Sequence, residues 1–306
     1  MTIDTLSSAQ EFSASIRKKT KVTGAGELKV DPNFIEEPNA AKVLEFAVKR
    51  QKNVLLVGPT GCGKSCLGIN VLARLGMAGE VFSCSGETST DDLIGKILIT
   101  EGPNGQPITS VAYGAAVRAY KEGKALLLEE IDHANADILS ALHRLMELNQ
   151  TFYILNVGTQ EIIQKAPGFC VLATANTIGN GEDTFQYAGT KPINNATLNR
   201  FSYTIRMGYL DRAREVKIVK AKTGVDGRLA EQMVAAANYV RDRNSGHVVG
   251  EQVASVISTR DLLEWADAVV GMQMHPREAA QYAFLNRVSE SDREYFQKAI
   301  ENECPV

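Results

Sequence analysis

Short apolar runs alternate with amphipathic stretches along the first two thirds of the chain. The runs have strand length and lie at residues 53–57, 80–86, 125–128 and 169–176. Between them, apolar residues recur at helical spacing, as at 136–150, where Ile138, Leu142 and Leu145 share one stripe. Because strands that alternate with helices form parallel sheets covered on both faces, the pattern predicts an α/β fold.

Two further stretches, at 96–113 and 151–166, alternate apolar and polar residues on both sides of a turn. We interpret them as β-hairpins inserted into the α/β domain. From Asp211 onward strand-like runs disappear and helical patterns dominate. The predicted organisation is an N-terminal extension at 1–36, a parallel-sheet core at 37–207 and a smaller all-helical domain at 208–306.

Composition and charge limit the classes of function that this protein can have. The 306 residues carry a formal net charge of -3, with 44% hydrophobic and 23% charged residues, which is typical of a globular protein. This slightly negative net charge argues against strong, sequence-independent binding of nucleic acid. The basic run at 17–21 is interpreted as part of a loosely ordered extension rather than a functional basic arm.

Cysteine spacing and hydropathy indicate a cytoplasmic protein. The five cysteines include no CxxC pair, so we expect reduced thiols and no zinc site. No run approaches the roughly 20 apolar residues of a membrane span, and the first residues are too polar for a signal peptide. The four histidines show no metal-ligand spacing and are interpreted as surface or capping residues.

The strongest motif is GPTGCGKS at residues 58–65, which fits the phosphate-binding pattern G-x-x-x-x-G-K-[ST] in full. A predicted strand precedes it and a predicted helix follows it, as the motif requires. Its glycines allow successive backbone N–H groups to point at a phosphate, beside the positive end of the helix dipole. The predicted nucleotide-binding residues are Gly58, Pro59, Thr60, Gly61, Cys62, Gly63, Lys64, Ser65 and Cys66.

Within this motif, Lys64 is expected to reach the β- and γ-phosphates and to act in catalysis, and Ser65 to ligate Mg²⁺. Hydrolysis also needs carboxylates at the end of a neighbouring strand. The apolar run at 125–128 continues into Glu129 and Glu130. We expect Glu129 to hold the water shell of the metal, where aspartate is usual, and Glu130 to activate water. Asp132 is a further candidate for metal support, with helix capping as an equal alternative.

Taken together, these motifs resemble those of the AAA+ ATPases of the MoxR family. The resemblance covers about residues 43–268 and is closest to the branch that holds the cobalt-chelatase ATPase subunit and the Rubisco- and nitric-oxide-reductase-activating ATPases. The segments that carry it are GPTGCGKS, TSTDDLIGK, LLLEEID, LHRLME, the stretch from VLATAN to LNRF, and STRDLLEWA.

The resemblance implies roles for three more polar residues. Asn176 matches the first sensor, which orients the attacking water, with strand capping as the alternative. Arg200 matches the arginine finger, which completes a neighbouring subunit's site, with a surface salt bridge as the alternative. Arg260 matches the second sensor, which contacts nucleotide from the helical lid, with pairing to Asp261 or Glu264 as the alternative.

The family's properties imply an ATP- and Mg²⁺-dependent ATPase that acts as a homo-oligomer, a hexameric ring, and remodels a client protein. They also imply an adaptor of the kind that bears a von Willebrand factor A domain, and inserted hairpins that line the face or pore of the ring. Tyr113 is then either a pore contact or a packed aromatic. We expect no membrane partner.

Two alternatives stay open. A nucleic-acid motor is disfavoured because both predicted hairpins carry little net positive charge. A nucleotide-dependent scaffold that hydrolyses slowly or not at all is motivated by the glutamate at position 129.

Overall fold

The computed structural model describes residues 28–101, 103, 105–147, 151–157, 159–177, 193–244 and 253–304. The basic run at 17–21 lies outside the described residues. So does much of the stretch between VLATAN and LNRF on which part of the family resemblance depends.

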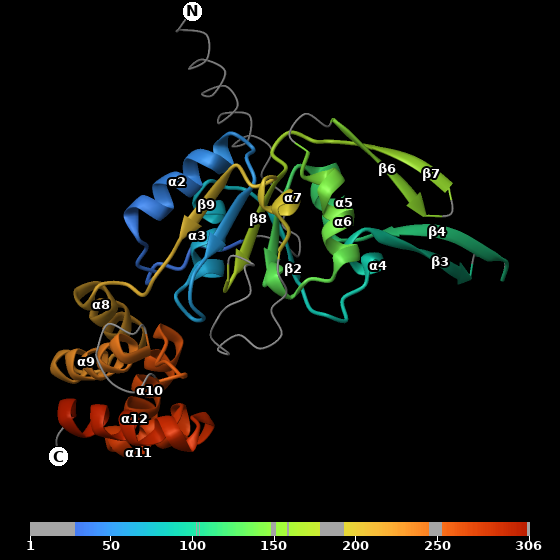
Figure 1. Cartoon of the computed structure of the whole chain (residues 1–306). Coiled ribbons are helices and arrows are strands. Elements are labelled where there is room, and N and C mark those ends of the chain that lie inside the picture. The colour runs from blue at the N-terminus through green and yellow to red at the C-terminus, as the bar shows by residue number, and fades with distance from the viewer. Residues whose placement is uncertain are drawn as a thin grey trace, which may run out of the picture.

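The centre of the molecule is a parallel sheet with the strand order β2-β5-β8-β1-β9 in the described residues (Figure 1). The strands are β1 (Val54–Val57), β2 (Gly79–Ser83), β5 (Ala125–Glu129), β8 (Cys170–Ala175) and β9 (Tyr203–Arg206). The four predicted runs are all strands, and β9 is an edge strand that the hydrophobic pattern did not single out. The α/β fold class is confirmed.

Helices cover both faces of this sheet (Figure 1). One face carries α2 (Pro38–Lys49) and α3 (Lys64–Arg74), and the other carries α5 (Ala115–Glu122) and α6 (Ala136–Leu145). Because successive strand residues point to opposite faces, Leu127 packs in one core with Leu67 of α3, while Leu126 and Leu128 pack in the other with Tyr120 of α5. Three short elements are α4 (Thr90–Leu93), η1 (Ile131–His133) and α7 (Asn195–Leu198).

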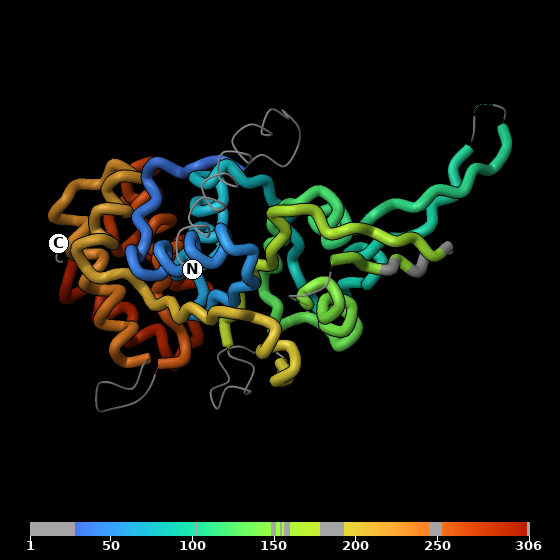
Figure 2. The backbone as a smooth tube through the Cα atoms, turned by 90° about the horizontal axis from the view of Figure 1, so that it is seen from above, coloured from blue at the N-terminus to red at the C-terminus, as the bar shows by residue number. Residues whose placement is uncertain are grey.

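Both predicted hairpins are present, within one or two residues of the expected bounds. One pairs β3 (Gly95–Glu101) with β4 (Pro107–Tyr113), and the other pairs β6 (Phe152–Val157) with β7 (Thr159–Gln164), both antiparallel. They project from the side of the core that lies away from α2 and from the helical domain, and β3–β4 reaches farthest (Figure 2).

Tyr113 lies at the base of these hairpins and joins them. Its hydroxyl donates to Glu161 Oε1 of β7 at 2.6 Å, and Lys121 of α5 donates to the same hydroxyl at 3.0 Å while lying over the ring. These contacts favour the packed-aromatic interpretation of Tyr113 over the pore contact.

The C-terminal part is helical throughout its described residues (Figure 1). Its elements are α8 (Arg212–Thr223), α9 (Gly227–Asn244), α10 (Thr259–Met272), α11 (Pro276–Ala283), η3 (Leu285–Arg287) and α12 (Glu290–Glu303). They enclose a separate core in which Trp265, Phe284 and Phe296 pack edge to face or tilted. His275 is the N-cap of α11, which confirms a capping interpretation for that histidine. We refer to this part as the lid.

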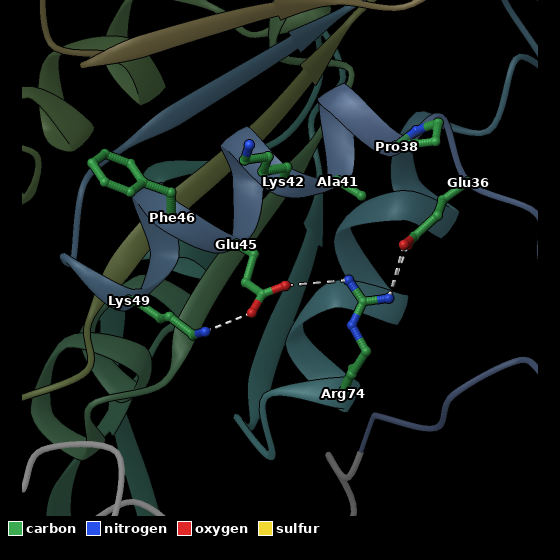
Figure 3. Close-up of a pocket in the computed structure, with 8 residues that line it drawn as sticks. All are labelled: Glu36, Pro38, Ala41, Lys42, Glu45, Phe46, Lys49 and Arg74. Carbon is green, nitrogen blue, oxygen red and sulfur yellow. Dashed lines mark hydrogen bonds and ion pairs between the residues drawn. The ribbon is translucent and has the colours of Figure 1, made fainter. Parts of the chain in front are cut away.

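A shallow groove lies between α2 and α3 (Figure 3). Its ion pairs join Arg74 to Glu36 and Glu45, and Glu45 to Lys49. Arg74 ends α3, roughly 15 Å along the helix from Lys64 at its start. The groove is therefore remote from the phosphate motif, and four of its five charged side chains are paired with one another. In the described ranges, no helix has the length and apolar character needed to cross a bilayer.

Candidate functional site

The phosphate motif forms the loop between the end of β1 and the start of α3. Gly63 is the N-cap of α3 and has φ 94°. This left-handed backbone conformation is unfavourable for residues with a side chain and is readily adopted by glycine. The loop is anchored to the sheet, because the N–H of Gly58 donates to the carbonyl of Ala175 at 3.2 Å. The start of α3 is therefore held at the carboxyl ends of β1 and β8, and Ser65 lies in its first turn.

Lys64 is the electrostatic centre of this region and is 9% exposed. Its ammonium donates to the carbonyls of Gly58 at 2.7 Å and Pro59 at 2.9 Å, and to Asn176 Oδ1 at 2.9 Å. Burial lowers the pKa of Lys64, and the charge of Arg260 acts in the same direction. Cys62 and two carboxylates, Asp132 and Glu130, oppose this shift. Charged groups from the phosphate loop, from the end of β5 and from the lid therefore act on this one ammonium.

Asp132 ties the end of β8 to the 3-10 turn that follows β5. It is 1% exposed, and its Oδ2 accepts from the backbone N–H of Asn176 at 2.9 Å and of Thr177 at 3.2 Å. The capping alternative for Asp132 is wrong, because the side chain of Asn135 caps α6. Asp132 Oδ1 is buried and has no hydrogen-bond partner among the described residues. An unpaired buried carboxylate oxygen is costly unless a cation or water approaches it.

The two glutamates lie where the sequence placed them, at the carboxyl end of β5. Glu129 points to the same face of the sheet as Leu127, and hence toward α3, and its Oε2 accepts from Ser83 Oγ at 3.0 Å. Glu130 has φ 56° and ψ 48°. This left-handed conformation is strained for a residue with a side chain, and such strain clusters at functional sites.

These residues fit a hard divalent cation. A hydroxyl at Ser65 and carboxylates at Glu129 and Asp132 are oxygen donors of the kind that Mg²⁺ prefers. In the described residues no cluster of three or more His, Cys, Asp or Glu residues could hold a metal by itself. Such a composition matches Mg²⁺ sites, which take one or two protein oxygens and complete their shell with phosphate and water.

The start of α10 in the lid lies against the phosphate loop. A Cβ atom built on Gly61 would lie 2.6 Å from Ser258 Oγ, so a side chain there would collide with the lid. Arg260 follows two residues later. Its predicted alternative partner Asp261 is engaged elsewhere, in a capping box with Ser258 and in an ion pair with Arg287.

Arg200 is the predicted site residue that the fold does not bring to Lys64. Asn53, just before β1, donates to its carbonyl at 3.1 Å, so Arg200 lies at the opposite end of β1 from the phosphate loop. Its guanidinium donates to the carbonyl of His143 at 3.3 Å and to Glu147 Oε1 at 3.4 Å. The predicted surface salt bridge therefore exists.

Sequence reasoning missed two residues that touch the phosphate loop. The hydroxyl of Tyr209 donates to the carbonyl of Thr60 at 3.0 Å, and Ser258 packs on Gly61. The capping pattern S-x-x-D at 258–261 could have indicated Ser258 as the start of a helix. For Tyr209 the sequence offers no signal, because its position depends on how the lid docks.

Two family models match the chain and together cover more than half of it. The AAA domain of the dynein-related subfamily matches residues 53–201, and the C-terminal domain of CbbQ, NirQ and NorQ matches residues 215–304. The chain is an AAA+ ATPase of the MoxR, CobS and CbbQ type. The first match contains the phosphate motif and the strands β1, β2, β5 and β8, and the second covers the lid from within α8 onward.

Similar proteins agree with this membership. The chain is 28% identical to the aerobic cobaltochelatase subunit CobS of Sinorhizobium over 89% of its own length and 82% of the relative. It is 29% identical to an uncharacterised protein of Staphylococcus haemolyticus over 82% of its own length and 89% of the relative. A RuvB variant of Thermotoga maritima matches in fold with a TM-score of 0.50 at 15% identity, over 88% of this chain and 70% of that one.

Proposed function

We propose that this AAA+ protein hydrolyses ATP with Mg²⁺ and uses the cycle to remodel a partner protein. The observation that carries the proposal is the convergence on Lys64 of the phosphate loop, the Asn176 amide, the carboxylates of Glu130 and Asp132, and Arg260 of the lid. A triphosphate placed at the loop would meet a buried cation and the positive end of α3.

Each residue has a separate task in this proposal. Lys64 exchanges its carbonyl partners for β- and γ-phosphate oxygens. Ser65, Glu129 and Asp132 would hold Mg²⁺ or its water shell, and the bound ion would supply positive charge against the phosphate oxygens. Glu130 takes a proton from the attacking water, and Asn176 orients that water. The loop residues from Gly58 to Cys66 hold the phosphates with backbone N–H groups, and Arg260 contacts them from the lid.

A ring of identical subunits is part of the proposal. Arg200 lies at the far end of β1, and its guanidinium is suited to stabilising charge on transferring phosphoryl oxygens. If Arg200 serves a neighbour's nucleotide, the ATP site of a single chain lacks its arginine finger. A closed ring of subunits supplies that residue at every interface, and the family resemblance implies that the ring is a hexamer. The two hairpins carry the most exposed apolar side chains of the core, which suits contact with a client or with an adaptor bearing a von Willebrand factor A domain.

The compartment we infer is the cytoplasm. All five cysteines are free thiols, and four of them are buried. Free thiols of this kind are typical of a reducing compartment.

The test is steady-state phosphate release with ATP and Mg²⁺ across a series of protein concentrations. Specific activity should rise with concentration, and Glu130→Gln and Arg200→Ala should each abolish it. Mixing Lys64→Ala with Arg200→Ala should restore part of the activity, because some interfaces then combine an intact loop with an intact finger. Lack of restoration at concentrations where the protein is oligomeric would contradict the shared site.

The same assay separates the rival functions. Background turnover with intact ATP binding, in the presence and absence of candidate partners, would favour the nucleotide-dependent scaffold. Stimulation by single- or double-stranded DNA would favour the nucleic-acid motor. The RuvB likeness bears on the fold alone.

A further inference from the structure

A buried ion pair in the lid connects the two places where the lid touches the phosphate loop. Glu215 of α8 is 0% exposed and Arg241 of α9 is 8% exposed. Arg241 donates to Glu215 with both terminal nitrogens, from Nη1 to Oε2 at 2.6 Å and from Nη2 to Oε1 at 3.0 Å. A bidentate, fully desolvated pair has one geometry, so it fixes α8 and α9 relative to each other.

The same pair holds the chain on both sides of Ser258. Arg241 Nε donates to the carbonyl of Ile257 at 2.8 Å, and the hydroxyl of Thr259 donates to Glu215 Oε1 at 2.6 Å. Ser258 lies between these anchors and packs on Gly61 of the phosphate loop. Arg260 comes next, so the pair determines where the first turn of α10 presents Arg260.

A second contact with the loop starts from the other side of the pair. The guanidinium of Arg241 lies 3.8 Å from the ring centroid of Tyr209, and the hydroxyl of Tyr209 donates to the carbonyl of Thr60 at 3.0 Å. Tyr209 belongs to the short connection between β9 and α8, where the core ends and the lid begins. Thr60 and Gly61 are adjacent, so the lid contacts the phosphate loop at two neighbouring residues.

We propose that Tyr209, Glu215, Arg241 and Thr259 form a positioning network that sets Arg260 against the nucleotide and transmits the state of the phosphate loop to the lid. The inference rests on the proposed ATP site and adds the residues that link it to lid movement. A loop that shifts when a γ-phosphate arrives moves the Thr60 carbonyl and Gly61, and the rigid pair carries both displacements into α8, α9 and α10.

Such a network predicts an effect specific to the γ-phosphate. If Thr259 and Tyr209 act by holding Arg260 in place, their loss weakens ATP binding more than ADP binding, and has no further effect once Arg260 is absent. A merely structural role weakens both nucleotides equally and adds to the loss of Arg260.

The experiment measures ATP and ADP dissociation constants by calorimetry in a Glu130→Gln background, so that ATP is not consumed. The variants are Thr259→Val, Arg260→Ala and their combination. Thr259→Val should weaken ATP binding about threefold to tenfold, the effect of one hydrogen bond, and ADP binding less than twofold. The double variant should bind ATP no more weakly than Arg260→Ala alone.

Two controls keep the result specific. Thr259→Ser retains the hydroxyl and should restore the ATP preference. Thr223→Val removes a hydroxyl of α8 that donates to the carbonyl of Val219 and accepts from the N–H of Val225, both outside the network, and should leave both constants unchanged. If Thr259→Val does not fold, Tyr209→Phe removes only the hydroxyl that reaches Thr60 and should give the same selective loss.

Equal losses for ATP and ADP, or additivity of Thr259→Val with Arg260→Ala, would overturn the network. Failure of the Glu130→Gln protein itself to bind ATP would overturn the proposed function, and this inference with it.

Discussion

The side-chain oxygen of Asn176 accepts a hydrogen bond of 2.9 Å from the ammonium of Lys64, joining the end of β8 to the start of α3. The two residues are 112 positions apart in the chain and meet because β8 and β1 are neighbouring parallel strands. This bond places an uncharged amide beside the cation expected to hold the γ-phosphate.

Asn176→Ala should lower kcat for ATP about 10- to 100-fold while changing ATP affinity little. The reason is that a side chain that orients water contributes to the chemical step rather than to nucleotide binding. Single-turnover phosphate release and calorimetric binding separate the two quantities. Asn244→Ala, which removes an amide in the lid, should leave kcat unchanged; an equal effect of both variants would argue against an orienting role for Asn176.

Asp132→Ala should lower the free energy of unfolding by about 2–4 kcal/mol, because it leaves the part-buried N–H of Asn176 and the buried N–H of Thr177 without their acceptor. Urea denaturation followed by circular dichroism measures the change. Asp137→Ala, an exposed carboxylate in the first turn of α6, is the matched control and should cost under about 1 kcal/mol. Similar losses from both changes would contradict a structural role for Asp132 at the end of β8.

Glu129→Ala should reduce the gain in ATP affinity that Mg²⁺ provides, by about tenfold, because the carboxylate proposed to hold the water shell of the metal is removed. The measurement compares ATP dissociation constants with Mg²⁺ and with EDTA. Glu80→Ala is the control, since that carboxylate lies on the neighbouring strand β2, opposite Leu126 near the start of β5, and pairs with Arg118 and Lys124. An unchanged Mg²⁺ dependence in Glu129→Ala, with a loss in Asp132→Asn, would exclude Glu129 from the metal site and leave Asp132 as its carboxylate.

Stability should fall as the pH is lowered from 7.5 to 5.5, in part through His143. Burial lowers the pKa of His143 below 6.5, and the neighbouring Arg200 charge adds to this effect. The unfolded state then binds the proton more readily than the folded state, so stability is lost below about pH 6.5 until the folded imidazole also protonates. The difference in unfolding free energy between the wild type and His143→Gln, measured across this range, should shrink toward acid. A constant difference would show that His143 does not titrate on unfolding.

The local motifs could be identified from the sequence because the residues of each motif are contiguous in the chain. Residues 58–65 carry the loop, the glycines and the helix start in one segment, and the apolar run before Glu129 and Glu130 indicates a strand that ends in carboxylates. Strand and helix periodicity likewise indicated the sheet core, both hairpins and the helical lid. Short-range pattern is sufficient here because hydrophobic spacing and turn residues act within a few positions.

Features that depend on contacts between distant segments could not be predicted from the sequence. Asp132 had the right charge for a metal or for a helix cap, and only the pairing of β5 with β8 places it beneath the N–H groups of Asn176 and Thr177. The edge strand β9 lacks a strong apolar run, and it forms because β1 offers it a free edge.

The sequence by itself determined the α/β core, the lid and a phosphate loop with its lysine, since each is encoded by neighbouring residues. The tertiary structure alone decided that Glu215 and Arg241 would be buried together and that Tyr209 and Ser258 would touch the loop. It also decided that Arg200 would lie at the other end of β1. These relations join segments far apart in the chain, and their geometry depends on how the sheet and the lid pack rather than on any local spacing.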